Sequence, residues 1–370
     1  MFRSHGIVLS AAILLIGIPV EVVARSKAPE PVIEPVVGKA APELNWTNPA
    51  ATNILLPIAL PPSPPHAVKT SQPITPVVTW MSLNSWAAAH RLKAPKELAD
   101  LPEKAFTLES PNGVMTLGIG SREVTWNGIE INLGFAPQII DGEVCLYGAD
   151  FQKNLEPLLC GVPYVLPQTN RTIVIDPGHG GSNPGTVCVL DGRLEKEFTL
   201  DLALRIKPLL ETNGWTVFLT RTADVDVVNS NRVTFADAHH ADLFVSLHFN
   251  ATGDRDPYTS GIETYCVTPT GLPSTLTRDY PDPQFAVWPN NAFDTQNLLL
   301  AVRVHNAMIR TLGLEDRGVY RARFMTVLRG QSRPSILIEG GYLSNPRDAK
   351  LIENPDYRQK LAETIANALK

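Results

Sequence analysis

The sequence contains few cysteines, no cluster of basic residues and only one long apolar run. Four cysteines in 370 residues are too few to hold a chain of this size together through disulfides, although one or two bridges remain open. A formal net charge of −5, without any run of Lys and Arg, excludes the basic surface that binding to nucleic acid or anionic lipid requires. The chain is 44% hydrophobic, which is enough to bury a large core in about two domains. The cysteines are Cys145, Cys160, Cys188 and Cys266.

The one long apolar run begins the chain. Arg3 precedes an apolar stretch at residues 7–20, and small or short side chains follow as far as Ala24. This order is typical of a secretory signal peptide, so we expect residues 1–24 to be removed and the mature protein to be periplasmic or extracellular. An uncleaved anchor is the alternative, but the stretch is shorter than about 18 residues and contains Pro19. No later segment is apolar for long enough to span a membrane, and no cysteine near the cleavage site suggests a lipid anchor.

Proline is concentrated in the next segment. Residues 27–78 hold 12 of the 32 prolines of the chain, including PPSPP at 61–65, and show no sustained helical or strand period. Such a chain lacks the backbone donors for a sheet and behaves as a semi-rigid spacer. Residues 25–78 are therefore predicted to be a linker.

A small α+β domain is predicted from residue 79 to residue 167. LNSWAAAHRL at 83–92 has helical spacing, and short strand-like segments alternate from Phe106 onward. Asn127-Gly128 separates REVTW from IEINLG. A tight primed turn needs positive φ at both central residues, which Asn and Gly accept, so a hairpin is expected here.

Part of this domain resembles a known module. SREVTWNGIEINLGFAPQIIDGEVCLYGADFQKNLEPLL, residues 121–159, is similar to the stalk-like domain first known from the N-terminus of copper amine oxidases, which recurs in bacterial wall enzymes. The resemblance implies a spacer or wall-targeting module, and a folded domain of unknown role is the equal alternative. It implies no copper chemistry, because His90 and two separated cysteines are the soft ligands of the stretch.

Residues 170–370 are predicted to form an α/β domain with a mixed, mostly parallel sheet flanked by helices. Its apolar strands alternate with helices, which is the pattern of a sheet covered on both faces. Pro208 lies inside the first helix, so that helix is expected to kink or end early. The expected strands are TIVID, WTVFLT, DLFVSLH, GIETYCV and SILIE, and the expected helices are residues 195–213, 229–241, 294–312 and 355–369.

Three chemically capable side chains follow or end strands of this sheet. His179 comes just after TIVID, His248 ends DLFVSLH and Glu339 ends SILIE. The carboxyl ends of parallel strands meet at one edge, where ligands collect. Glu195 begins the first helix after a loop with several glycines, at residues 180–192, so it can reach the same edge.

These four residues predict a hydrolytic zinc site. Two imidazoles and one carboxylate, from His179, His248 and Glu195, bind Zn²⁺ and leave a fourth position for water, and Glu339 would then be the general base. Zinc lowers the pKa of its water to near 7 and polarises a carbonyl. Each residue alone has a plainer interpretation, as a hydrogen-bonded core histidine or a Glu favoured by the helix dipole. Together at one edge they favour an amide hydrolase.

The same segment resembles the zinc-dependent N-acetylmuramoyl-L-alanine amidases of bacterial cell walls, of the class called amidase type 3. By that resemblance His179, Glu195 and His248 fall on the zinc ligands and Glu339 on the catalytic glutamate, in a phosphorylase/hydrolase-like amidase fold acting on peptidoglycan. The motifs, in the order of the family, are IDPGHGG (175–181), LEKEFTLDLALRIKPLLETNGWTVFLTR (194–221), NRVTFADAHHADLFVSLHFNA (231–251), DRGVYRARFMTVLR (316–329) and SILIEGGYLSNPRDAKLI (335–352).

Other candidates for the site are weaker. Arg329 and Asn250 lie inside these motifs and are expected to contact substrate, although a plain salt bridge is the alternative for Arg329. Glu197 is a distant second metal candidate, since it would point to another helix face. Cys188 could ligate zinc as a thiolate, but it lies in a loop that the family does not use. Structural or surface roles are expected for His239, His240 and His305.

A long connection at residues 252–297 departs from the commoner family pattern. Long loops beside a site tend to form lids or binding walls, so Tyr280–Trp288 is expected to shape the substrate groove. The prolines disfavour a long regulatory plug helix, and constitutive activity is the hypothesis, with a protein activator left open. The sequence thus predicts an exported zinc amidase that cleaves between the lactyl group of N-acetylmuramic acid and L-alanine. A zinc peptidase of the stem peptide and an inactive peptidoglycan-binding protein are the alternatives.

Overall fold

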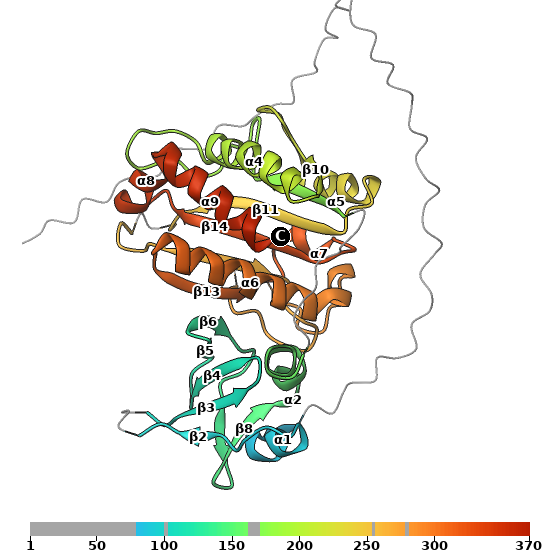
Figure 1. Ribbon diagram of the computed structural model, residues 1–370, viewed down its shortest axis with the longest axis vertical. Coiled ribbons are helices and arrows are strands. Elements are labelled where there is room, and N and C mark those ends of the chain that lie inside the picture. Colours follow the sequence, from blue (N-terminus) through green and yellow to red (C-terminus); the bar gives the residue numbers. More distant parts are fainter. Residues whose placement is uncertain (1–78, 100–102, 162–170, 254–255, 278–280) are drawn as a thin grey trace, which may run out of the picture. The chain divides into compact units, whose positions relative to one another are not determined.

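A computed structural model of the chain describes residues 79–370 with four gaps (Figure 1). The predicted signal peptide and linker, and the predicted boundary between the two folded domains, lie outside the described residues. The gaps are residues 100–102, 162–170, 254–255 and 278–280.

A mixed sheet forms the centre of the C-terminal domain. Its strand order is β10-β9-β11-β14-β12-β13, with β12 antiparallel to β14 and the other neighbouring pairs parallel, which confirms the predicted fold class. β11 and β14 lie inside the sheet and are buried along nearly their whole length, as their continuous apolar runs predict. The strands are β9 (Thr172–Pro177), β10 (Thr216–Leu219), β11 (Leu243–Asn250), β12 (Ile262–Cys266), β13 (Asp316–Arg321) and β14 (Ser335–Tyr342).

Helices cover both faces of this sheet. α4, α9 and α6 pack together on one face (Figure 1), and α5 and α7 pack on the other over a second apolar cluster that includes Phe244 and Leu337. Alternate residues of a strand point to opposite faces, so Leu243 and Val245 of β11 belong to the first cluster and Phe244 to the second. The helices are α4 (Glu195–Thr212), α5 (Asn229–Ala238), α6 (Asp294–Leu312), α7 (Thr326–Arg329), α8 (Pro346–Glu353) and α9 (Pro355–Ala368), with the 3-10 helix η2 (Pro289–Phe293) before α6.

Two helix boundaries differ from the prediction. α4 continues through Pro208 to Thr212, so it does not end early at the proline, and its last residue comes one before the predicted Asn213. α5 ends at Ala238 rather than at residue 241, since His240 takes a positive φ of 48°.

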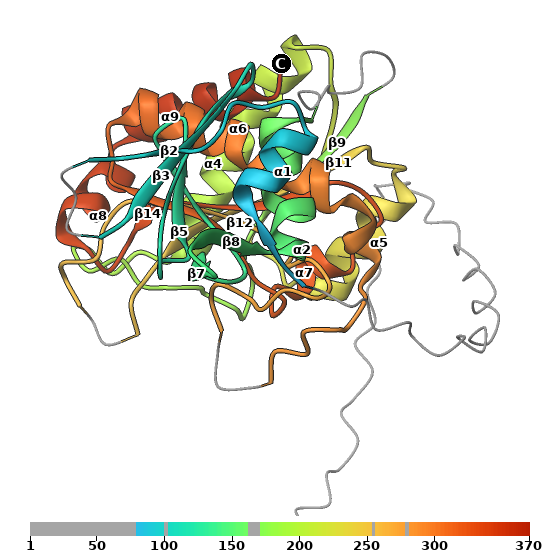
Figure 2. The ribbon, with the colours of Figure 1, turned by 90° about the horizontal axis from the view of Figure 1, so that it is seen from below.

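The accessory domain is a small α+β unit, as predicted. Its strands β2 to β6 form an antiparallel meander in which each strand pairs with the next, as β2 does with β3 (Figure 2). Asn127 and Gly128 both have positive φ, 52° and 81°, which confirms the hairpin between β5 and β6. The elements are β1 (Trp80–Ser82), α1 (Leu83–Ala89), β2 (Lys96–Glu97), β3 (Ala105–Ser110), β4 (Gly113–Gly118), β5 (Glu123–Trp126), β6 (Ile129–Asn132), β7 (Gln138–Ile140), β8 (Glu143–Tyr147), α2 (Gly148–Asp150), the π-helix η1 (Phe151–Leu155) and α3 (Glu156–Leu159).

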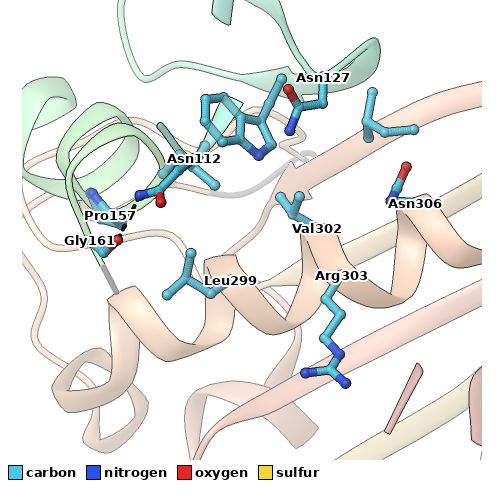
Figure 3. A pocket seen from close by; sticks show the side chains of 11 residues that line it. Asn112, Asn127, Pro157, Gly161, Leu299, Val302, Arg303 and Asn306 are labelled. Carbon is cyan, nitrogen blue, oxygen red and sulfur yellow. Dashed lines mark hydrogen bonds between the residues drawn. The ribbon is translucent and has the colours of Figure 1, made fainter. Parts of the chain in front are cut away.

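The two predicted folded domains belong to one compact unit and share one sheet, which the sequence did not predict. β6 pairs in parallel with β13 through Ile131 and Val319, and Asp316 accepts a hydrogen bond from the Glu130 N–H at 3.0 Å. A hollow of about 280 Å³ lies where the predicted accessory domain meets α6, and Asn127, Pro157 and Val302 are among the residues that line it (Figure 3). All four cysteines are free. In the part of the chain that the structure describes, no helix combines the length and the apolar character needed to cross a membrane.

Candidate metal centre

His179 is held on a tight turn after β9. The residue itself has φ 60° and Gly180 has φ 127°, so the backbone here occupies a region that few side chains tolerate. Two buried arginines hold the turn by its carbonyl groups: Arg221 donates to Gly178 O at 2.8 Å, and Arg232 donates to His179 O at 2.8 Å. The imidazole Nδ1 lies 2.9 Å from Asn183 Oδ1, which leaves Nε2 facing the site.

Glu195 is the first residue of α4, and its side chain is 5% exposed. The backbone N–H groups of Thr186 and Phe249 donate to its two carboxylate oxygens at 2.9 and 3.1 Å. A carboxylate at a helix N-terminus is also favoured by the helix dipole. Glu195 is therefore kept ionised and fixed in position although it is buried.

His248 lies on β11, and its ring packs directly over Gly178. A Cβ atom at residue 178 would lie 2.3 Å from this ring, and a Cβ atom at Gly185 would lie 2.5 Å from Glu195 Oε2. Such distances are far below van der Waals contact, so the two glycines provide the space in which the site residues meet.

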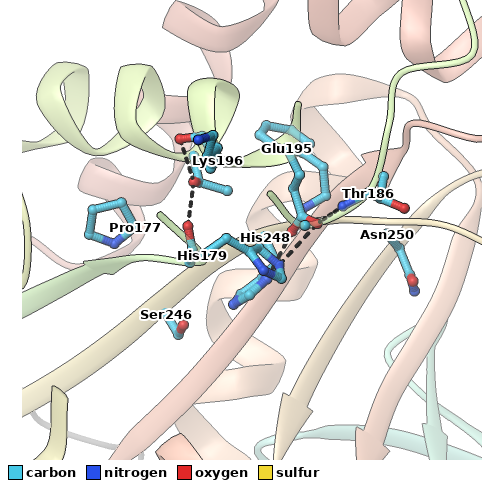
Figure 4. A network of polar contacts seen from close by, with 12 residues as sticks. Pro177, His179, Thr186, Glu195, Lys196, Ser246, His248 and Asn250 are labelled. Atoms are coloured by element: carbon cyan, nitrogen blue, oxygen red, sulfur yellow. Dashed lines mark hydrogen bonds and ion pairs between the residues drawn. The ribbon is translucent and has the colours of Figure 1, made fainter. Parts of the chain in front are cut away.

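The three side chains converge on one point (Figure 4). Glu195 Oε2 lies 3.0 Å from His179 Nε2, and Glu195 Oε1 lies 2.9 Å from His248 Nδ1. The two imidazole rings meet edge to face with centroids 4.8 Å apart. One ligand atom from each residue lies within 4.8 Å of the others, which suits a single ion.

The charges of Glu195 and His179 each shift the pKa of the other residue. Burial alone would raise the pKa of Glu195, but the hydrogen bonds and charges of His179 and His248 outweigh it and hold the pKa well below its ordinary value. Burial lowers the pKa of His179, yet the hydrogen bond and charge of Glu195 outweigh that effect and raise the pKa overall. The site therefore attracts positive charge, whether protons or a cation.

Glu339 shares the pocket of these residues. It lies beside His248 in the parallel pairing of β14 with β11, so both side chains are on the same face of the sheet. The pocket has a volume of about 430 Å³, and its lining includes His179, His248, Glu339, Asn250 and Thr326. The four predicted site residues are thus brought to one pocket at one sheet edge.

A buried support behind the site was not predicted from the sequence. Asp176 is 1% exposed and accepts hydrogen bonds from Thr220, Ser246 and Arg232. Arg232 also donates to Pro177 O at 2.9 Å. This network fixes the chain just before His179. The acidic residue directly before Pro177 at a strand end was the available signal.

The other candidates lie elsewhere. Glu197 caps α4 by accepting from the Leu194 N–H, and Cys188 Sγ lies 3.4 Å from Glu353 Oε1. His305 is fully buried and contacts Asp316 Oδ1 at 2.8 Å, a packing role as predicted. His239 packs against Phe235 and Phe218 at the end of α5, and His240 is exposed.

The two predicted substrate contacts differ in position. Asn250 lines the pocket, and its Nδ2 donates to Glu263 Oε2 at 2.7 Å. Arg329 does not line this pocket but lies in a neighbouring hollow, with its guanidinium 4.3 Å from the centre of the Trp288 ring. Trp288, from the connection predicted to shape the groove, thus lies beside the site, and Tyr280 is outside the described residues.

The side chains of His179, Glu195 and His248 are chemically suitable ligands for a metal ion. The Glu195 carboxylate lies 3.0 and 2.9 Å from the two imidazoles, and one ligand atom of each residue lies within 4.8 Å of the others, so the three can share one ion; the open pocket leaves room for water or substrate. Asn183 and the Thr186 and Phe249 amides supply the outer hydrogen bonds that orient such ligands.

Known proteins match the C-terminal domain. N-acetylmuramoyl-L-alanine amidase CwlM of Bacillus licheniformis is 32% identical over 199 residues, which cover 53% of this chain and 66% of that protein. AmiA of Salmonella typhimurium is 30% identical over 224 residues and is covered to 75%. The solved AmiC2 of Nostoc punctiforme is 31% identical with a TM-score of 0.45, and the match covers 55% of this chain and 97% of that one. Residues 173–370 match the amidase type 3 family, described as N-acetylmuramoyl-L-alanine amidase, and the chain belongs to this family.

Proposed function

We propose that this chain is a zinc-dependent N-acetylmuramoyl-L-alanine amidase, which hydrolyses the amide between the lactyl group of N-acetylmuramic acid and L-alanine in peptidoglycan. The observation that carries the proposal is the convergence of His179, Glu195 and His248 beside Glu339 in one open pocket. It occurs in a chain of the N-acetylmuramoyl-L-alanine amidase family.

His179, Glu195 and His248 would hold the zinc ion. A zinc ion bound there would polarise the scissile carbonyl and lower the pKa of water to near 7. The chain supplies a rigid frame for it: the imidazole of His179 is oriented by Asn183, and both oxygens of Glu195 are fixed by backbone amides. A rigid frame keeps the ligands in place while the substrate changes shape during attack.

Glu339 is the proposed general base. Its carboxylate would accept a proton from the attacking water and then give it to the nitrogen of L-alanine as that amine leaves. Its position next to His248 on the paired strands, in the lining of the pocket, supports this role. This assignment separates the metal-holding residues from the proton-transferring one.

The proposed setting is outside the cytoplasm. Residues 1–24 would direct export, residues 25–78 would give reach, and the catalytic domain from residue 170 would act on the wall. The accessory domain from residue 79 to 167, proposed to be related to the copper amine oxidase N-terminal module, would be a spacer or wall-targeting unit. Peptidoglycan is the proposed partner, and a protein activator is not required by this proposal.

Metal removal and return test the proposal. Dialysis against a chelator is expected to abolish the release of new amino groups from purified peptidoglycan, and an equivalent of Zn²⁺ is expected to restore it, whereas Mg²⁺ is not. His179→Ala should lose both the bound zinc and the activity. His240→Asn is the matched control, since His240 is exposed and outside the site. Full activity in the chelated protein would refute zinc dependence.

A further inference from the structure

A second hollow adjoins the pocket of the candidate metal centre. It has a volume of about 190 Å³, and Phe324 lines both cavities. A substrate held at the metal centre can therefore extend past Phe324 into this hollow. Its lining includes Trp288, Arg323 and Arg329, which come from the segments before η2, before α7 and at the end of α7.

The hollow is rich in donors that lack acceptors. Arg329 makes no ion pair with a described carboxylate; its one hydrogen bond is a long one of 3.4 Å to Arg323 O, and its charge rests over the Trp288 ring. Trp288 Nε1 and Arg323 Nε are buried and have no hydrogen-bond partner. Buried donors without acceptors are costly, so these two, together with the weakly bonded Arg329, point to an acceptor that arrives with a ligand.

The charge of the hollow favours an anion. Asp282 is its one described carboxylate, and it is already engaged by Ser274 and by Arg323 Nη1 at 2.8 Å. Among the described residues that line the hollow, two guanidinium groups stand against one carboxylate, which leaves the charge of Arg329 uncompensated. An arginine that is stacked on an aromatic ring presents its planar fork to a carboxylate in a fixed orientation.

We propose that this hollow is a subsite for a free carboxylate of the stem peptide beyond L-alanine. The inference rests on the proposed function, because it assumes that the amide before L-alanine lies at the metal centre. The peptide then continues across Phe324, and its carboxylate accepts hydrogen bonds from Arg329 and from the indole N–H of Trp288. The enzyme would thereby distinguish peptides with free carboxylates from those with carboxamides.

The test uses two soluble muropeptides that differ only in whether the stem carboxylates are free or amidated. The wild-type protein is expected to turn over the free form with a kcat/KM about 10-fold higher or more, as for a hydrogen bond to a charged group. Arg329→Gln is expected to remove this preference by slowing the free form and sparing the amidated form. Trp288→Phe keeps the ring under Arg329 and removes the N–H, so it should reduce the preference in part.

Controls separate this site from a structural effect and from the proposed function. Arg347→Gln changes an exposed arginine away from both cavities and should keep the preference. Equal loss on both muropeptides in Arg329→Gln, or no preference in the wild type, would overturn the subsite. If neither muropeptide is cleaved, the proposed function fails. Calorimetry of the binding of the two stem peptides, free of the glycan, then tests the subsite separately. The peptide with free carboxylates should bind more tightly to the wild type, and this difference must disappear in Arg329→Gln.

Discussion

Gly178 leaves room for the His248 ring because it has no side chain. We expect Gly178→Ala to displace the His248 ring, because the new Cβ would lie 2.3 Å from it, and to lower zinc occupancy and turnover by at least about tenfold. Metal analysis of the purified variant measures the first effect. Gly118→Ala is the control, since its Cβ would meet Ser121 at 3.9 Å. Normal zinc content in Gly178→Ala would show that the ring can shift without loss.

Substitution of Glu339 should lower the rate of the reaction without loss of bound zinc. Glu339→Gln keeps the shape and removes the base, so kcat is expected to fall about 10²- to 10⁴-fold while bound zinc stays near the wild-type amount. Steady-state kinetics and metal analysis on the same preparation check both points. If kcat is retained, the base is another group; if zinc is lost as well, Glu339 belongs to the ligand set.

The raised pKa of Asp150 should make the stability of the folded state depend on pH. Burial raises its pKa to about 6, although the amides of Gly134 and Phe135 and the side chain of Asn154 donate to it. The folded state then holds the proton more tightly than the unfolded state, whose pKa is near 3.9. The free energy of unfolding should therefore rise, from this residue, as the pH falls from about 7 to about 4.

Urea unfolding at several pH values measures this effect. The difference in stability between the wild type and Asp150→Asn should shift in favour of the wild type as the pH falls through that window, by about 1 to 3 kcal/mol. Taking the difference cancels the carboxylates with lowered pKa, such as Asp201 and Asp316, which act in the opposite direction. A difference that does not change with pH would contradict the raised pKa.

At the level of single residues, the sequence predicted the four residues that share the pocket but not the buried residues that hold them in position. His179, Glu195, His248 and Glu339 could be found because strand ends share a sheet edge. The roles of Arg221 and Arg232 could not, since they depend on which carbonyl groups of the turn point inward. Such information resides in the tertiary arrangement and not in local spacing.

At the scale of elements, β13 and α8 were missing from the prediction. The strand DRGVYR is half polar and includes a glycine at φ 93°, so it lacks the continuous apolar run of β11. It is a strand because β12 pairs with it on one side and β6 on the other. α8 is short and begins directly with Pro346 after the Asn345 cap, and its eight residues give little periodic signal.

The β6–β13 pairing predicts that the accessory domain stabilises the catalytic one. Deleting residues 79–161 would leave the edge of β13 without its partner strand and would expose Val319, which is 1% exposed in the whole structure. We expect the chain from residue 168 to melt several degrees lower than the chain from residue 73 and to associate at high concentration. Calorimetry and light scattering on the two proteins measure this. Equal melting temperatures would show that the shared sheet adds no stability.

At the scale of the whole molecule, two domains of different character form one continuous sheet of eleven strands. The alternation of strands and helices predicted each domain, but no local pattern specifies which edges pair between them. The consequence is a fixed relation between the accessory strands and β13, whose neighbour β12 pairs with β14, the strand that carries Glu339.

The bond that is cut distinguishes an amidase from a peptidase of the stem peptide. Mass spectrometry of the soluble products, after incubation of the mature protein with purified peptidoglycan with and without a zinc chelator, identifies this bond. We predict free stem peptides that begin with L-alanine, together with glycan that has lost its peptides, and neither product in the presence of the chelator. Shortened peptides still joined to muramic acid would instead identify a peptidase of the stem and refute the proposed amidase.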